Sequence, residues 1–175
     1  MSPTDQDPLI LAKQLALPVV IFTAKDSQGK VLGMVTTIAY ASLQPLIFVS
    51  TLNAASKSAE AILAAGLFNI SYLQDKHRQC LEMFSLNANK DLQEAGFSLS
   101  TPANSQAPYI EDALAAFQGK VENTVPLANS RLLLFSPVLI LPTALDASQS
   151  PLIRYNRSYA RLSEPIYPAR DKYPV

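Results

Sequence analysis

Hydroxyl-bearing and basic side chains that could hold a phosphate group are concentrated in the first half of the chain. Thr36, Thr37 and Ser42 follow a predicted turn, and Ser56, Lys57 and Ser58 precede an apolar stretch with helical spacing. The start of a helix offers N–H groups without intrahelical partners, and its dipole favours an anion. Lysine and hydroxyl groups would add charge-assisted hydrogen bonds to the same anion. The pattern predicts a site for a phosphate-bearing cofactor.

The elements that must position these residues are mostly strands. Residues 19–25 are β-branched and aromatic, and residues 26–30 have turn composition, with Gly29 able to supply a positive φ, so a hairpin is expected. Residues 31–42 are predicted to continue as one strand, on which Met34, Thr36, Ile38 and Tyr40 share a face. Residues 46–51 are apolar enough for a strand buried on both faces.

Two short helices are expected to flank the next strand. Ser56 is a suitable N-cap and Gly66 a suitable C-terminal residue for a helix over 56–65. Residues 67–73 alternate between apolar and polar, which predicts a half-buried strand. A second helix is predicted from Asp75 to about Leu86, with an inner face formed by Cys80, Leu81 and Phe84.

The second half of the chain is predicted to be mainly strand as well. Residues 87–108 are polar, with a surface excursion expected around residues 98–108. Residues 110–117 could form a short helix, and residues 117–124 and 131–141 are expected to form a strand pair interrupted at Pro137. A final strand carries alternating basic and aromatic residues: Arg154, Tyr155, Arg157, Tyr159 and Arg161. Strands without a repeating strand–helix rhythm predict a mainly β fold with short helices, mostly antiparallel and closed as a barrel.

Composition excludes several classes of partner. The 14 basic and 14 acidic residues balance, so no net field would attract nucleic acid or anionic lipid. The single cysteine excludes an intramolecular disulfide framework, and no leader-like segment or membrane-spanning apolar run is present in the sequence. We therefore expect a cytoplasmic protein that neither binds nucleic acid nor enters a membrane, with one domain over 17–165 between tails 1–16 and 166–175.

The remaining reactive residue types are predicted to be structural. His77 is the only histidine, which excludes a metal site built on several histidines, and we expect no metal. Lying between Lys76 and Arg78, it is interpreted as a surface residue. Cys80 is interpreted as a buried structural thiol, and Glu111 and Asp112 as solvated charges.

Several segments, taken in order, resemble the flavin reductase-like, FMN-binding split-barrel family. Residues 18–24 look like the opening strand of that family, and residues 33–42, followed by Pro45 and Leu46, look like its flavin loop. Residues 56–68 are similar to its phosphate-side helix and the strand start that follows. Residues 151–162 are similar to its closing strand. The resemblance covers residues 17–162.

The resemblance implies a split β-barrel homodimer with FMN at the subunit interface. NADH or NADPH would reduce the flavin, and the reduced flavin could serve a separate monooxygenase. With five glycines and no Gly-x-Gly-x-x-Gly motif, the chain offers no separate nicotinamide fold, so the nicotinamide would stack on the flavin. The implied cofactor-binding residues are Thr36, Thr37, Ala39, Tyr40, Ser42, Ser56, Lys57, Ser58 and Ser71; no catalytic residue is assigned.

Two alternatives follow from departures from the family pattern. The family usually has two serines where this chain has Ile38 and Ala39, and its Gly-Asp-His-Thr segment has no match around residues 127–132. The missing segment favours a flavin-binding electron carrier or redox sensor without reductase turnover. The missing serines favour a split barrel that has lost its cofactor and acts as a binding module. A barrel of the pyridoxamine 5′-phosphate oxidase type remains an alternative at the level of the fold.

Overall fold

A computed structural model describes residues 9–86, 91–103, 105, 107–143 and 150–162. The predicted hairpin is present as β2 (Val20–Lys25) and β3 (Val31–Thr36), which pair antiparallel. In the turn between them, Gly29 has a φ of 80°, and the N–H groups of Gln28 and Lys30 donate to Asp26 Oδ1. Positive φ is nearly free of strain for glycine, so the turn confirms the role predicted for Gly29.

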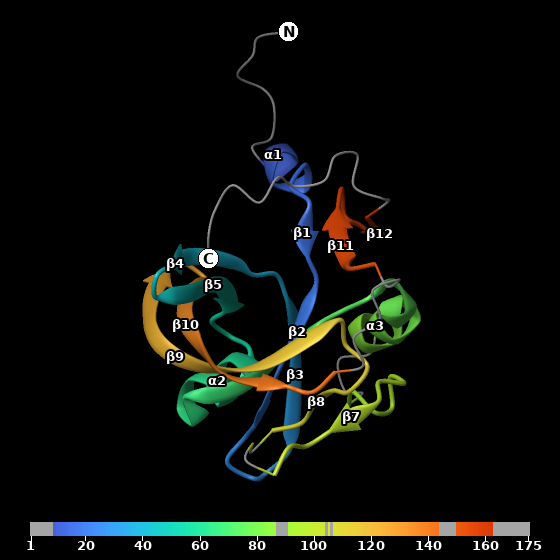
Figure 1. Cartoon of the computed structure of the whole chain (residues 1–175). Helices are drawn as coiled ribbons and strands as arrows, with labels where there is room; N and C mark the ends of the chain where they lie inside the picture. Colours follow the sequence, from blue (N-terminus) through green and yellow to red (C-terminus); the bar gives the residue numbers. More distant parts are fainter. Residues whose placement is uncertain (1–8, 87–90, 104, 106, 144–149, 163–175) are drawn as a thin grey trace, which may run out of the picture.

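A seven-stranded antiparallel sheet forms the body of the molecule, in the order β3-β2-β6-β9-β10-β5-β4 (Figure 1). Its other strands are β6 (Leu67–Tyr72), β9 (Ala115–Leu127), β10 (Ser130–Leu141), β5 (Leu46–Asn53) and β4 (Ala39–Leu43). The predicted late strand pair is β9 and β10, whose register shifts between Leu134 and Phe135 and between Pro137 and Leu139. The predicted mainly β, mostly antiparallel architecture is confirmed.

The two ends of this sheet meet at a seam, which we define as Thr36, Thr37, Ser50 and Thr51. Thr36 Oγ1 lies 3.0 Å from Ser50 Oγ and donates to the Thr51 carbonyl at 3.3 Å, and Ser50 Oγ donates to the Thr37 carbonyl at 2.8 Å. These bonds join β3 to β5, which are not paired by a backbone ladder. Side-chain hydrogen bonds therefore close the barrel at this point.

The prediction of one strand over residues 31–42 is wrong. The chain leaves β3 after Thr36, crosses the seam, and enters β4 at Ala39. Ile38 turns into the core, whereas Tyr40 is 67% exposed. β5 is also not buried on both faces. Leu46 and Thr51 are exposed, and only the edge strand β4 lies beyond β5 in the sheet.

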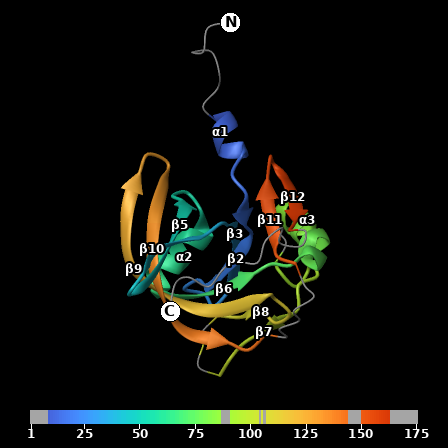
Figure 2. The ribbon, with the colours of Figure 1, turned by 45° about the horizontal axis from the view of Figure 1, so that its top comes forward.

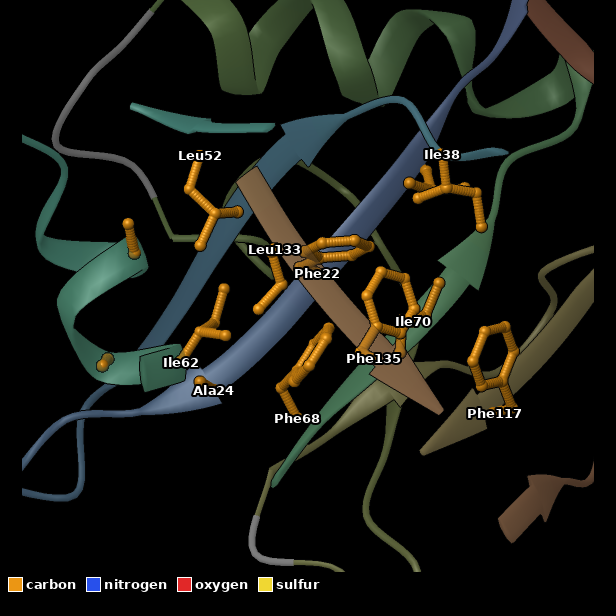
Figure 3. Close-up of a cluster of buried hydrophobic side chains, with 13 residues drawn as sticks. Phe22, Ala24, Ile38, Leu52, Ile62, Phe68, Ile70, Phe117, Leu133 and Phe135 are labelled. Atoms are coloured by element: carbon orange, nitrogen blue, oxygen red, sulfur yellow. The ribbon is translucent and has the colours of Figure 1, made fainter. Parts of the chain in front are cut away.

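Aromatic rings fill the inside of the barrel (Figure 3). The ring centroid of Phe135 lies 5.6 Å from that of Phe22, 5.3 Å from that of Phe68 and 5.6 Å from that of Phe48. Helix α2 (Lys57–Ala65) contributes Ile62 to the same core and packs on β2 and β3. Gly66 ends it in the left-handed region at φ 68°, as predicted.

A second core lies on the other face of the sheet. Along β2, Val20, Phe22 and Ala24 belong to the barrel core, and Ile21 belongs to the second core, as strand alternation requires. The predicted second helix is present as the 3₁₀ turn η1 (Asp75–His77) and α3 (Arg78–Leu86), and Gln74 rather than Asp75 caps it. Leu81 is buried in this core.

Among the described residues, no helix is long and apolar enough to cross a membrane.

The segment between α3 and β9 differs from its prediction. Leu92 and Phe97, in the segment predicted to be polar, are buried in the second core. Within the expected excursion, β7 (Leu99–Ser100) pairs with β8 (Tyr109–Ile110), so the described part of 98–108 is more than a surface excursion. The helix predicted over 110–117 is absent, because β8 and β9 take its two ends. Residues 87–90, 104 and 106 lie outside the described residues.

A small third sheet joins the two ends of the described chain in the order β1-β11-β12 (Figures 1 and 2). It consists of β1 (Leu17–Pro18), β11 (Leu152–Tyr155) and β12 (Ser158–Arg161). The basic-aromatic segment is thus a hairpin that turns at Asn156 and Arg157, and not the single strand predicted. The predicted N-terminal tail contains helix α1 (Leu9–Lys13), whereas residues 1–8 and 163–175 lie outside the described residues.

Candidate functional site

The start of α2 carries three of the predicted cofactor-binding residues. Ser56 occupies the N-cap position with extended backbone (φ −84°, ψ 126°), yet its side chain makes no capping hydrogen bond. Lys57 is exposed, and no carboxylate in the described part of the chain lies within ion-pair distance of it. Ser58 Oγ donates to the Gly33 carbonyl at 2.9 Å, which ties the helix start to β3.

Thr36 and Thr37 lie together at the seam, at the other end of β3 from this helix. The Thr36 hydroxyl is engaged with Ser50 and Thr51, and the Thr37 carbonyl accepts from Ser50. Ser50 is 4% exposed and was not among the predicted site residues. A hydroxyl inside the apolar run 46–52 was the signal available for it, because a polar group buried in such a run needs a partner.

Ala39, Tyr40 and Ser42 lie on the edge strand β4, beyond the seam. Ala39 and Tyr40 are exposed, and Ser42 is half-buried. The pairing of β4 with β5 shifts register between Tyr40 and Ser42, which lets neighbouring side chains depart from simple alternation. These residues are near the seam in sequence, and β4 pairs with the seam strand β5, but within the described part of the chain no hydrogen bond joins them to Thr36 or Ser56.

Ser71 lies apart from the other predicted site residues. It is fully buried on β6, between Ile21 of β2 and Ala116 of β9. Its Oγ accepts the N–H of Ile110 at 3.0 Å. The structure therefore gives this hydroxyl a role in holding β8 against the sheet.

His77 is buried, and its assignment to the surface is wrong. It is 3% exposed, and its Nδ1 accepts the N–H of Gln74 at 3.1 Å while Nε2 lies 3.0 Å from Asp112 Oδ1. Because Nδ1 accepts, the proton belongs on Nε2 and is donated to Asp112. Asp112 also pairs with Lys76 at 2.8 Å, so it is not the solvated charge predicted. This cluster fastens η1 to the loop after β8.

Burial lowers the pKa of His77, although hydrogen bonding to Asp112 opposes that effect. Burial alone would raise the pKa of Asp112, but hydrogen bonds from Lys76 and His77 outweigh it and lower that pKa. Histidine in an unfolded chain has a pKa of about 6.5. Below that pH the unfolded chain therefore binds a proton at His77 more strongly than the folded chain does. Folding stability attributable to His77 is complete above about pH 6.5 and is lost as the pH falls.

We therefore expect the free energy of unfolding, measured by urea titration, to decrease between pH 7.5 and pH 5.5. Because His77 is the only histidine, the variant His77→Gln should be less stable at pH 7.5 and show a flatter dependence over this window. Equal slopes for the two proteins would show that His77 does not resist protonation.

Cys80 is a partly exposed free thiol that packs against the second core. Within the described ranges, no three His, Cys, Asp or Glu residues are grouped so as to hold a metal ion.

A phosphate fits the start of α2 by the chemistry of its donors. The Ser56 hydroxyl is not used by a cap, the Lys57 ammonium is exposed, and the first N–H groups of a helix have no intrahelical partner. These groups are all hydrogen-bond donors, as an anion requires. The single hydroxyl proton of Ser58 is already donated to the Gly33 carbonyl, so the Ser58 side chain would orient this site and not bind the anion through that proton.

Comparison with known proteins identifies the family. The sequence model of the family "flavin reductase like domain" matches residues 12–163, and the chain belongs to this family. No curated protein sequence matched the chain.

Solved structures share the fold over most of the chain. Nitrilotriacetate monooxygenase component B from Mycobacterium thermoresistibile is 23% identical, with a TM-score of 0.80 over 93% of this chain and 90% of its own. The styrene monooxygenase flavin reductase from Pseudomonas putida S12 is 20% identical, with a TM-score of 0.76 over 92% and 100%. The NADH:FAD oxidoreductase SgcE6 from Streptomyces globisporus C-1027, in complex with NAD and FAD fragments, is 15% identical, with a TM-score of 0.78 over 95% and 98%. The predicted split-barrel fold is confirmed.

Proposed function

We propose that the protein is an FMN-binding flavin reductase that uses NADH or NADPH and passes reduced flavin to a separate monooxygenase. The observation that carries this proposal is the set of uncommitted donors at the start of α2, tied through β3 to the seam. Membership of the flavin reductase-like family supports it. So does the fold that the chain shares with the styrene monooxygenase flavin reductase and the NADH:FAD oxidoreductase.

In this proposal Ser56 and Lys57 hold the FMN phosphate. Thr36, Thr37, Ala39, Tyr40 and Ser42 border the ring system, and Ser58 fixes the helix start on β3. Bound FMN would supply the redox chemistry, accepting a hydride from the reduced nicotinamide. His77 takes no part, because it is buried and committed to Gln74 and Asp112. The free thiol of Cys80 fits the reducing cytoplasm.

We also propose that two copies associate through the end of the sheet formed by β10, β5 and the edge strand β4, which would place the flavin at their interface. Consecutive strands β4, β5 and β10 expose large apolar side chains there, and exposed apolar area of this kind marks interaction surfaces. The exposed fractions are 67% for Tyr40, 65% for Leu43, 49% for Val138 and 85% for Ile140.

Titration with FMN, followed by flavin fluorescence, tests the proposed site. Replacing Lys57 by Gln and Ser56 by Ala should each weaken FMN binding by about tenfold, since each removes a hydrogen bond to a charged group. Ser56→Ala should leave folding stability within about 0.5 kcal/mol, because no capping bond is lost. The matched control is Lys120→Gln, an exposed lysine on β9 that pairs with Glu122 and should bind FMN normally.

Saturable FMN binding by the wild type together with rapid NAD(P)H oxidation supports the proposal. Binding without oxidation would favour the electron carrier, and the absence of binding would favour the cofactor-free module. Unchanged affinity in Lys57→Gln and Ser56→Ala would remove the start of α2 from the site.

A further inference from the structure

Ser50 is a buried hydroxyl on β5 that reaches the chain where it leaves β3. Its side chain is 4% exposed, and its backbone pairs with the fully buried Leu133 of β10. Ser50 Oγ donates to the Thr37 carbonyl at 2.8 Å, whereas Thr36 Oγ1 lies 3.5 Å from the same carbonyl, which is too far for a strong hydrogen bond. Thr37 lies between the end of β3 and the start of β4, outside the backbone ladders. The Ser50 hydroxyl therefore fixes the orientation of the peptide group between Thr37 and Ile38.

The orientation of this peptide group decides where the Ile38 N–H points. The bond between Thr37 and Ile38 is trans. In a planar trans peptide the C=O and N–H groups point in opposite directions. Because the Thr37 carbonyl faces Ser50, the Ile38 N–H faces away from Ser50. In the part of the chain that the structure describes, this N–H has no hydrogen-bond partner.

The unpartnered N–H lies beside the proposed flavin site. Thr37, on one side of it, lines a cavity of about 330 Å³ between the N-terminal segment and the β11–β12 hairpin. Ala39, on the other side, is exposed at the start of β4. Ile38 itself is 5% exposed and places its side chain in the barrel core (Figure 3). A backbone N–H without a partner at so buried a residue is uncommon, and an acceptor atom of a ligand would satisfy it.

We propose that Ser50 is a positioning residue, which holds the Thr37–Ile38 peptide so that the Ile38 N–H donates to the ring system of the bound flavin. The inference rests on the proposed function, which places the flavin ring at Thr37 and its neighbours. The ring offers carbonyl oxygens and ring nitrogens as acceptors, and it gains negative charge when it is reduced. A hydrogen bond to a charged group contributes more than one to a neutral group. The Ile38 N–H therefore stabilises reduced flavin more than oxidised flavin.

This assignment changes the meaning of Ile38 for the site. The flavin reductase-like family usually has a serine at this position, and the apolar side chain favours loss of the cofactor when side chains alone are considered. A backbone donor is present whatever the side chain is, and the isoleucine anchors it by packing in the core. The replacement of serine by isoleucine thus removes a hydroxyl group and leaves the site with a fixed donor.

Two measurements on the full chain with FMN test the assignment. Hydrogen exchange of the Ile38 amide, followed by NMR, should slow at least about tenfold when the wild type binds FMN, and Ser50→Ala should lose most of this protection. Ser50→Ala should also weaken the binding of reduced FMN about tenfold more than that of oxidised FMN, since the lost hydrogen bond is stronger to the charged form. That ratio lowers the two-electron midpoint potential of bound FMN by about 30 mV. Ser50→Thr keeps the hydroxyl and should restore both readouts.

The matched control is Thr23→Val, which removes another buried hydroxyl that donates to a loop carbonyl. Thr23 is fully buried on β2, and its Oγ1 donates to the Pro108 carbonyl. Thr23→Val should lower the thermal stability to a degree similar to Ser50→Ala, because each removes one buried hydrogen bond. It should leave the protection of the Ile38 amide and the potential of bound FMN unchanged. Equal changes in both variants would show that Ser50 is merely structural and would overturn the inference.

Protection of the Ile38 amide by FMN that is lost in Ser50→Ala and kept in Thr23→Val supports the inference. An Ile38 amide that exchanges equally fast with and without bound FMN would overturn it and leave the proposed function intact. An unchanged midpoint potential in Ser50→Ala would overturn it as well. A wild type that binds no FMN would refute the proposed function, and the inference with it.

Discussion

Replacing Phe135 by Ala should lower the free energy of unfolding by about 3–5 kcal/mol. Phe135 is fully buried at the centre of the barrel, beside Phe22 and Phe68 (Figure 3). Its ring also stacks on that of Phe48. Truncation removes the burial of the ring and leaves a void. The surrounding rings come from three other strands and cannot all move inward, so the void will persist.

Chemical denaturation monitored by circular dichroism measures this loss. The matched control is Ile140→Ala on the same strand, where the side chain is 85% exposed and the expected change is within about 0.5 kcal/mol. Similar losses in the two variants would show that Phe135 does not organise the core.

Replacing Gly119 by Val should overpack the core, and not leave a void in it, and should lower the free energy of unfolding by about 3 kcal/mol or more. A Cβ atom at this position would lie 2.7 Å from Ile70 Cδ1, 3.1 Å from Phe135 Cδ2 and 3.2 Å from Phe68 Cζ. Both rings are fully buried, so neither can swing into solvent. Here β9 approaches the core so closely that only a residue without a side chain fits.

A double-mutant cycle distinguishes this steric cause from a loss of strand propensity. In the Phe135→Ala background, Gly119→Val enters the vacated space and should cost less than it does in the wild type, by at least about 1 kcal/mol. Additive losses, measured by the same denaturation experiment, would contradict the contact between these positions.

Elements with local signals could be predicted from the sequence. The β2–β3 hairpin carries a turn with Asp26 and Gly29, and α2 is bounded by Ser56 and Gly66, so both follow from neighbouring residues. The segment 110–117 has no such boundary signals, and it is drawn into β8 and β9 by pairing with Leu99, Ser100 and β6, which lie far along the chain. Tertiary pairing overrides local preference in such segments.

The candidate site could be predicted in part for the same reason. Thr36 and Thr37 at the seam, and Ser56 and Lys57 at the helix start, are hydroxyl and basic residues at the ends of recognisable elements. The burial of His77 depends on Asp112, 35 residues away, and one cavity is lined both by Lys13 from the start and by Arg157 from the end of the described chain. Neither juxtaposition has a signal within the sequence around these residues.

Closure of the barrel by side chains has a consequence for its fluctuations. Backbone ladders hold every other junction in the seven-stranded sheet, whereas the seam is held by the hydrogen bonds of two hydroxyl groups, those of Ser50 and Thr36. Each neutral hydrogen bond contributes only about 1 kcal/mol, so local opening there costs far less than global unfolding. A ligand that binds across the closed seam lowers the free energy of the closed barrel by its binding free energy. Ligand binding and barrel closure are therefore thermodynamically coupled. The part of the proposed flavin site that would border the ring system then lies at the most easily opened junction of the barrel.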